Sequence, residues 1–245
     1  MPTVLVISEA AINRPHRRAY DLLAREPGWS VHLVAPSRLS VGDSFKPCDP
    51  APADAAYVLH PLPMALHKVP RFQWFVGLAG VAARVRPDVV FVEWDAGSWP
   101  VLHAWLVSRP FRSPVVTYTV ENIRRNRWRN AGTALRRAAP TIAIREAVAG
   151  VLEVLGQQAM SGLTSVNEDG ISIYRDDRRW RGPAEFVPLG TDMELFRPMD
   201  AGPLRRELGL DGSFVIGYFG RLIPEKSVHR LVEALPELGE ETKLL

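Results

Sequence analysis

Short apolar segments that alternate with helical segments constrain this chain most, because such alternation is typical of a parallel sheet covered by helices. The pattern begins with an apolar strand over 4–7, a helix over 15–25 and a second strand over 30–35. It continues with strands over 57–60, 88–92, 114–119, 163–166 and 185–188, and with helices over 71–84, 99–107 and 131–155, the last interrupted near Pro140. We therefore predict an α/β fold that begins with a doubly wound, Rossmann-like domain.

The segment PLGTDMELFRP, over 188–198, lacks periodicity and has a proline at each end, as an ordered linker does. After it we expect a helix over 203–208, a strand over 214–219, a helix over 225–235 and a strand from Thr242. These patterns predict an N-terminal domain over 1–187, a linker over 188–198 and the start of a second Rossmann-like domain over 199–245. The strand over 214–219 is nearly all apolar and needs neighbouring strands beyond Leu245, so we expect a truncated second domain and a fragment of a longer protein.

The stretch VIGYFGRLIPEKSVHRLVEAL, over 215–235, predicts a strand, a turn and a helix, with Arg221 and Lys226 at the turn. A turn of this kind that carries two cations is suited to hold a phosphate group. Gly220 would let the backbone approach that phosphate. The alternative is that both cations only solvate the turn and that Gly220 is an ordinary turn glycine.

The segments over 188–198 and 217–235 resemble two motifs of the retaining GT-B glycosyltransferases of family 4. In that family a proline–glycine–aspartate linker precedes a Gly-Arg pair, a Glu-Lys-Gly triplet and a leucine-rich helix. The resemblance implies a GT-B fold and transfer of a sugar from a nucleotide-diphosphate donor with retention of configuration. It also implies that Arg221 and Lys226 bind the donor diphosphate.

Three departures from the family pattern bear on function. Ser227 stands where the family has glycine, and the first turn, SEAAINRPHRR, lacks the usual glycine-rich loop. The segment YTVENI, over 118–123, lacks the histidine that many members carry there. The paired acidic residues of the family would lie beyond Leu245, so we expect the chain alone to be inactive.

Polar residues follow three of the predicted strands at their carboxyl ends, where ligands collect in open α/β sheets. We expect Glu121 to be the catalytic carboxylate, because such a group can bind a sugar hydroxyl or act as a base. The other acceptor-side candidates are Glu9, Asn13, Glu93 and Asn122. The alternative for these four is that they cap or begin the helices that follow.

A basic block without acidic residues lies between Glu121 and Glu146, although the net charge of the chain is only +3. Its arginines are Arg124, Arg125, Arg127, Arg129, Arg136, Arg137 and Arg145. A solvated helix face is one interpretation, and binding of an anionic membrane or an anionic substrate through 124–137 is another. The small net charge argues against a nucleic-acid partner.

Other residue types exclude several classes of site. Cys48 is the single cysteine, so no internal disulfide can form, and the histidines lack the spacing of a zinc site. We expect no cofactor and no metal, since the nucleotide sugar is a substrate and the phosphate cations are side chains. The beginning MPTVLVISEA has no positively charged leader, and no apolar window of the sequence is long enough to span a bilayer. We therefore predict a cytoplasmic protein, which would lie at the inner face of the membrane if the basic block binds lipid.

Two further functions stay open beside the glycosyltransferase, whose acceptor would be a sugar or a lipid-linked sugar. One is a non-catalytic binding module that uses the basic face over 124–137. The other is a different GT-B enzyme, such as a sugar-nucleotide epimerase. The linker and the sequence RLIPEK favour the glycosyltransferase.

Overall fold

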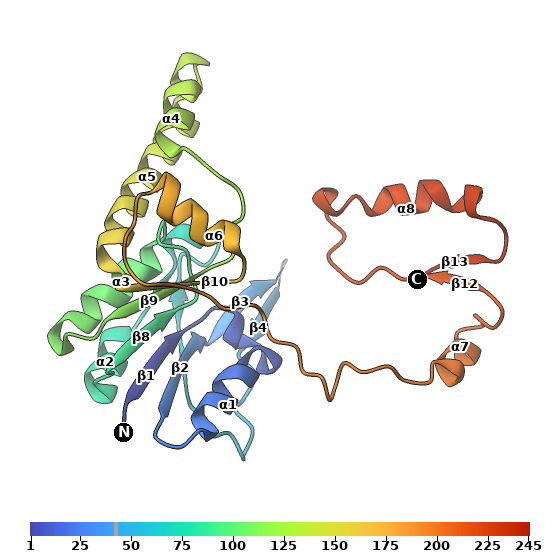
Figure 1. Cartoon of the computed structure of the whole chain (residues 1–245), viewed down its shortest axis with the longest axis horizontal. Helices are drawn as coiled ribbons and strands as arrows, with labels where there is room; N and C mark the ends of the chain where they lie inside the picture. Colours follow the sequence, from blue (N-terminus) through green and yellow to red (C-terminus); the bar gives the residue numbers. More distant parts are fainter. Residues whose placement is uncertain (42–43) are drawn as a thin grey trace. The chain divides into compact units, whose positions relative to one another are not determined.

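A parallel sheet of seven strands forms the centre of the computed structural model, which describes residues 1–41 and 44–245 (Figure 1). The strand order is β11-β10-β9-β8-β1-β2-β5. From β1 the chain first builds β2 and β5 on one side, then returns to build β8 to β11 on the other, which confirms the doubly wound α/β prediction. The strands are β1 (Thr3–Ile7), β2 (Ser30–Pro36), β5 (Val58–Leu62), β8 (Val89–Val92), β9 (Val115–Thr119), β10 (Gly162–Ser165) and β11 (Ala184–Phe186).

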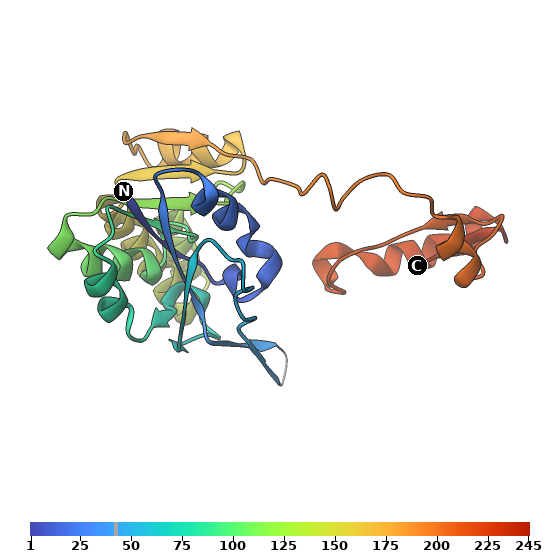
Figure 2. The same cartoon turned by 90° about the horizontal axis from the view of Figure 1, so that it is seen from below.

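Helices cover both faces of this sheet (Figure 2). Leu5 and Ile7 of β1 pack against α2 (Leu78–Val85) and α3 (Trp99–Ser108) on one face. The alternate residues Val4 and Val6 pack on the other face, in a cluster that includes Tyr20 and Leu23 of α1 (Arg18–Arg25). Because side chains alternate along a strand, burial on both faces explains why the strands are apolar throughout.

Short elements replace parts of two predicted helices. The helix expected over 15–25 begins as the 3-10 turn η2 (Arg14–Arg17), after η1 (Ala10–Ile12), and continues as α1. The prediction of a helix over 71–84 is wrong in its first half, where β7 (Trp74–Phe75) pairs with β6 (Met64–Ala65). Gly77 separates β7 from α2 with φ +90°, a conformation that suits glycine and ends the extended segment.

The remaining short elements of this part of the chain lie in its connections. They are β3 (Arg38–Val41), β4 (Ser44–Pro47), η3 (Pro70–Phe72) and η4 (Arg109–Phe111).

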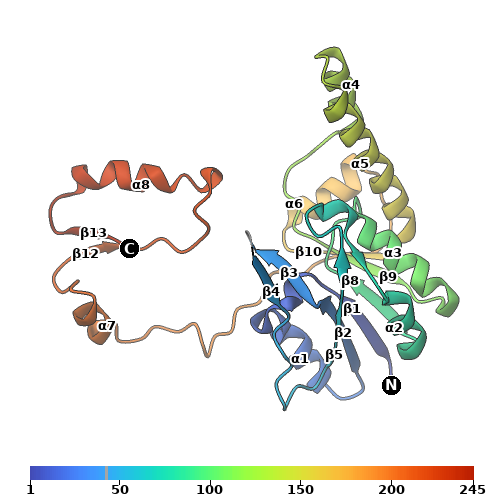
Figure 3. The ribbon, with the colours of Figure 1, turned by 180° about the vertical axis from the view of Figure 1, so that it is seen from behind.

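A helical hairpin projects from the sheet between β9 and β10 (Figures 1 and 3). It consists of α4 (Arg127–Arg136) and α5 (Pro140–Ala159). Pro140 is the first residue of α5, where a backbone N–H would have no acceptor inside the helix, so the missing N–H of proline costs no hydrogen bond. After β10 the chain forms α6 (Glu168–Ser172) and the π-helix η5 (Ile173–Asp177). The interruption predicted near Pro140 is confirmed.

Residues Thr191–Leu245 form a second compact unit, separate from Met1–Gly190. In this unit β12 (Phe214–Ile216) and β13 (Thr242–Leu244) pair in parallel, so it contains one βαβ motif. Between them lie η6 (Pro224–Lys226), α8 (Val228–Ala234) and η7 (Leu235–Leu238), and α7 (Gly202–Glu207) precedes β12. The predicted strand over 214–219 stops at Ile216, so residues 217–223 form a loop rather than a tight turn.

None of the helices within residues 1–41 and 44–245 has both the length and the apolar character needed to cross a bilayer.

Candidate functional site

The carboxyl ends of β1, β8 and β9 lie side by side, because these strands are neighbours in the parallel sheet. Glu9 follows β1 by two residues, Glu93 follows β8 directly, and Glu121 follows β9 by two residues. All three carboxylates therefore belong to one edge of the sheet. Their partners differ, so each has a different chemical character.

Both carboxylate oxygens of Glu93 accept a hydrogen bond from a neighbouring side chain. Ser8 Oγ donates to one oxygen and the hydroxyl of Tyr20 donates to the other. Burial and the charge of Glu93 raise the pKa of Tyr20 far above its usual range, which keeps the phenol protonated as a donor. Glu93 thus ties β8 to β1 and α1, and its contact with an acceptor stays a prediction.

Glu9 is held by a residue that sequence reasoning missed. Gln73, only 1% exposed, donates from Nε2 to Glu9 Oε2 at 3.0 Å and accepts from Trp94 Nε1 at 2.9 Å. Burial raises the pKa of the Glu9 carboxyl, and the hydrogen bond from Gln73 partly opposes this shift. The only signal in the sequence was a polar residue between Phe72 and Trp74 in an otherwise apolar run.

Two of the proposed capping roles are wrong. The Asn13 side chain makes no capping bond to η2 and instead accepts from Lys46 Nζ of β4. Asn122 is an exposed residue, and the cap of α4 is Asn126, whose Oδ1 accepts from the backbone N–H of Arg129 at 2.9 Å. Capping therefore accounts for neither Asn13 nor Asn122.

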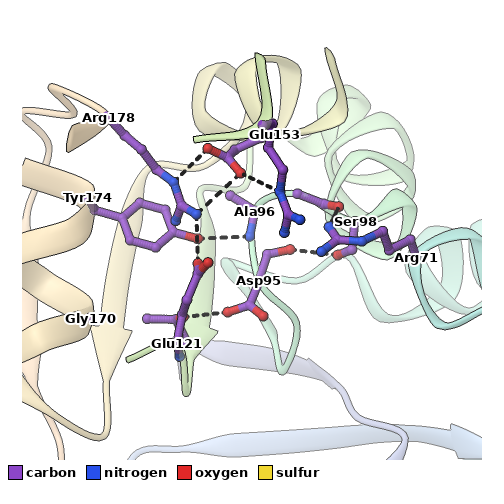
Figure 4. A network of polar contacts seen from close by, with 12 residues as sticks. Arg71, Asp95, Ala96, Ser98, Glu121, Glu153, Gly170, Tyr174 and Arg178 are labelled. Atoms are coloured by element: carbon purple, nitrogen blue, oxygen red, sulfur yellow. Dashed lines mark hydrogen bonds and ion pairs between the residues drawn. The ribbon is translucent and has the colours of Figure 1, made fainter. Parts of the chain in front are cut away.

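Glu121 belongs to a buried network of charges at the ends of β8 and β9 (Figure 4). Arg178 Nη2 lies 2.7 Å from Glu121 Oε2, and Arg178 Nε donates to Glu153 Oε1 at 2.7 Å. The side chains of Arg178 and Glu121 are 6% and 13% exposed. The predicted catalytic carboxylate is thus an ion-paired group with one oxygen held by a guanidinium.

Asp95 lies next to this ion pair. Its carboxylate accepts from Thr119 Oγ1, which in turn accepts from the backbone N–H of Glu121 at 3.1 Å. Burial, and to a lesser extent the charge of Glu121, raises the pKa of the Asp95 carboxyl. The hydroxyl of Tyr174 accepts from the Ala96 N–H at 3.1 Å, so η5 is joined to the loop after β8.

The donor-side candidates lie in the second unit after β12: Gly220 and Arg221 on the loop over 217–223, and Lys226 at the end of η6. Arg221 and Lys226 are exposed, and no ion pair joins either of them to another residue of the described chain, 1–41 and 44–245. Tyr218 orders this loop, because its hydroxyl donates to the Arg221 carbonyl at 2.8 Å and its N–H donates to Leu245 O at 2.9 Å. A Cβ on Gly220 would lie 2.6 Å from the Tyr218 hydroxyl, so glycine leaves room for that bond.

Ser227 adopts the left-handed conformation, with φ +51° and ψ +32°. That region favours glycine, which is the residue expected at this position from the family motif. The departure at Ser227 therefore keeps the backbone conformation that the glycine would allow.

No protein-family model and no curated protein sequence matches the chain. Its fold resembles that of Phytolacca americana UGT2 complexed with UDP-2-fluoro-glucose and pterostilbene, with 10% identity and a TM-score of 0.50 over 100% of this chain and 71% of that one. It also resembles S. aureus MnaA in its structure with UDP, with 14% identity and a TM-score of 0.50 over 100% of this chain and 61% of that one. The fold is of the GT-B type.

The GT-B chain has two kinds of charged group at its candidate sites. The carboxylates Glu9, Glu93 and Glu121 are all engaged by protein donors, whereas Arg221 and Lys226 are exposed and form no ion pair within the described residues. Within residues 1–41 and 44–245 no three His, Cys, Asp or Glu side chains are grouped so as to hold a metal ion. The arrangement is chemically suited to bind a phosphate-bearing ligand through side-chain cations.

Proposed function

We propose that this protein is a retaining glycosyltransferase that uses a nucleotide-diphosphate sugar. The observation that carries the proposal is a pair of exposed cations, Arg221 on the loop after β12 and Lys226 at the end of η6, neither of which forms an ion pair within residues 1–41 and 44–245. This loop belongs to a GT-B fold that the chain shares with a structure containing UDP-2-fluoro-glucose.

The chemistry of the reaction explains why two cations are needed. When the bond between the sugar and the diphosphate breaks, negative charge grows on the leaving oxygen atoms. Arg221 would bind two phosphate oxygens in parallel and Lys226 would act as a point charge, so both would stabilise the transition state more than the ground state. Gly220 would let the backbone lie close to the phosphate.

The acceptor would be bound by the carboxyl edge of the first sheet. We assign Glu121 as the catalytic carboxylate and Glu9, Asn13, Glu93 and Asn122 as acceptor-side residues. Support for this set is the shared edge of β1, β8 and β9, where Glu9 remains half-buried beside Gln73. Arg178 would orient Glu121 through their 2.7 Å ion pair.

Calorimetric titration of the chain with UDP, GDP and ADP tests the donor site directly. We expect one nucleotide to bind, and Arg221→Ala or Lys226→Ala to weaken that binding about 10-fold or more, since each removes a charge-assisted hydrogen bond. Arg230→Ala is the matched control, because Arg230 is also an exposed cation of the second unit, on α8. Equal weakening by all three substitutions, or no nucleotide binding by the wild type, would contradict the proposal.

Because the chain alone is expected to be inactive, product analysis of a protein that carries this chain together with a complete second domain separates the glycosyltransferase from the epimerase alternative. With a nucleotide sugar and an acceptor, a retaining transferase gives a glycoside with the anomeric configuration of the donor. An epimerase changes the nucleotide sugar when no acceptor is present. Proton NMR of the anomeric signals distinguishes these outcomes, and an inverted glycoside would remove the retaining assignment.

A second candidate function is binding to an anionic membrane through the α4–α5 hairpin. Ile144, Val148, Val151 and Leu155 are exposed at spacings of four, three and four residues, so they form one apolar stripe along α5. The arginines over 124–137 would supply attraction to anionic lipid. The double variant Ile144→Ser, Val151→Ser should reduce sedimentation of the protein with phosphatidylglycerol vesicles. The control is Leu22→Ser, at an exposed position of α1, which should leave sedimentation unchanged. Equal binding by both variants would exclude this function.

A further inference from the structure

A hollow of about 500 Å³ opens in the first unit beside the amino end of α4 and the second half of α5. Five arginines line it, together with the two acidic residues Glu153 and Asp177. The arginines are Arg124, Arg125, Arg127, Arg129 and Arg178. The lining therefore carries an excess of positive charge.

Only some of these cations are neutralised by neighbouring acids. Arg124 pairs with Asp177, Arg127 lies 3.2 Å from Glu146, and Arg178 binds Glu121 and Glu153. Arg125 and Arg129 are exposed, and neither forms an ion pair within residues 1–41 and 44–245. These two arginines account for the positive charge that remains available to a ligand.

The hollow also has buried donors that lack acceptors in the part of the chain that the structure describes. Arg178 Nη1 and Arg127 Nε make no hydrogen bond to a described residue, although their side chains are only 6% and 7% exposed, and Arg127 Nε has an acid oxygen only at ion-pair distance, Glu153 Oε2 at 3.8 Å. A buried donor left without an acceptor destabilises the folded state, so such groups normally have a partner. Both side chains line the hollow, so an anion bound there would place negative charge next to the Arg127 and Arg178 guanidinium groups.

The amino end of α4 adds a third favourable feature. This helix has ten residues, and its first turn leaves backbone N–H groups without acceptors inside the helix. The Asn126 side chain satisfies only the N–H of Arg129. The positive end of the helix dipole favours an anion at the same place as Arg125 and Arg129.

We propose that this hollow binds a phosphate group, with Arg125 and Arg129 as its principal ligands. This inference rests on the proposed function in one respect, the role of Glu121 as the catalytic carboxylate. Arg178 lines the hollow and also binds Glu121, so a phosphate in the hollow would belong to the acceptor substrate. The acceptor class is then a phosphate-bearing molecule. Its phosphate comes either from a lipid headgroup or from a soluble phosphate ester.

Binding of inorganic phosphate, measured by calorimetry, tests the site. Arg125→Gln with Arg129→Gln should weaken phosphate binding about 10-fold or more. The matched control is Arg136→Gln with Arg137→Gln, which removes the same charge from exposed residues at the other end of α4. Equal weakening by the two double variants, or no phosphate binding by the wild type, would overturn the proposal.

One further measurement distinguishes a lipid phosphate from a soluble phosphate ester, and another distinguishes failure of the phosphate site from failure of the donor site. Binding to phosphatidylglycerol vesicles that requires Arg125 and Arg129 assigns the phosphate to a lipid headgroup, and binding to glycerol 3-phosphate alone assigns it to a soluble ester. The Arg125→Gln, Arg129→Gln variant should bind the donor nucleotide as the wild type does. If this variant loses nucleotide binding as well, the hollow is not a separate acceptor site and the proposal fails. If its nucleotide affinity is unchanged, the donor site and the phosphate site are independent of each other.

Discussion

Arg178 and Glu121 form an ion pair of 2.7 Å that joins the end of η5 to the loop after β9, across 57 positions of the sequence. Arg178 also binds Glu153 of α5, and its guanidinium carbon lies 4.3 Å from the centre of the Tyr174 ring. One cation therefore connects three segments at the carboxyl edge of the sheet. Breaking a buried pair usually costs more stability than the pair contributes, because the remaining charge is left uncompensated.

Arg178→Met should lower the free energy of unfolding by about 3–5 kcal/mol, since Glu121 and Glu153 would lose their shared partner inside the protein. Arg175→Met is the control, because Arg175 is an exposed residue of the same π-helix. Urea unfolding followed by tryptophan fluorescence reports on the correct unit, since every tryptophan lies within residues 1–190. Similar losses in the two variants would show that the buried pair does not stabilise the fold.

Gly156→Ala should destabilise the protein by about 1–3 kcal/mol, as an overpacked contact does. A Cβ at Gly156 would collide with the backbone carbonyl of Ala96, where α5 crosses the loop after β8. Gly132→Ala is the control, because Gly132 lies within α4 and has no atom within 4 Å of its Cβ position. That substitution should raise stability by up to about 1 kcal/mol through helix propensity. The same urea experiment measures both, and a neutral Gly156→Ala would contradict the close crossing.

Stability should decrease on acidification because of His103. This residue stacks on Trp74 at 4.4 Å between ring centres, and burial lowers its pKa from 6.5 to about 4. Between about pH 6.5 and pH 4 the unfolded chain binds a proton at this residue that the folded protein does not. The free energy of unfolding should therefore fall as the pH drops through this window, by up to about 1.4 kcal/mol per pH unit.

His103→Phe keeps an aromatic ring against Trp74 and removes the titrating group. Unfolding free energies of this variant and of the wild type should diverge as the pH is lowered from 7 to 4, with the variant less sensitive. Parallel pH profiles would mean that His103 is not responsible for the acid sensitivity.

The sequence was sufficient to predict the strands of the seven-stranded sheet and their order of appearance, because burial on both sheet faces leaves nearly continuous apolar runs such as 4–7. Pro140 likewise divided the long helical region correctly. The segment before α2 was predicted wrongly, since strands of two residues such as β7 are too short to show a period of two.

The candidate site was predicted only in part. Parallel topology brings Glu9, Glu93 and Glu121 to one edge, and this follows from their positions after apolar strands. Their partners come from distant segments, namely Tyr20, Gln73 and Arg178, and no local pattern marks such tertiary contacts. Whether a carboxylate is free or already paired was thus beyond what the sequence alone could predict.

Gln73 lies directly before β7, in the connection that closes the short β6–β7 hairpin, and 64 positions separate it from Glu9. The length of this hairpin therefore determines whether a hydrogen-bond donor reaches the Glu9 carboxylate. An insertion or a deletion between β6 and β7 that removed this hydrogen bond would raise the pKa of the Glu9 carboxyl further, without altering any residue at the sheet edge. Variation in the length of this hairpin would in this way change the electrostatics of the sheet edge while the sheet itself stays the same.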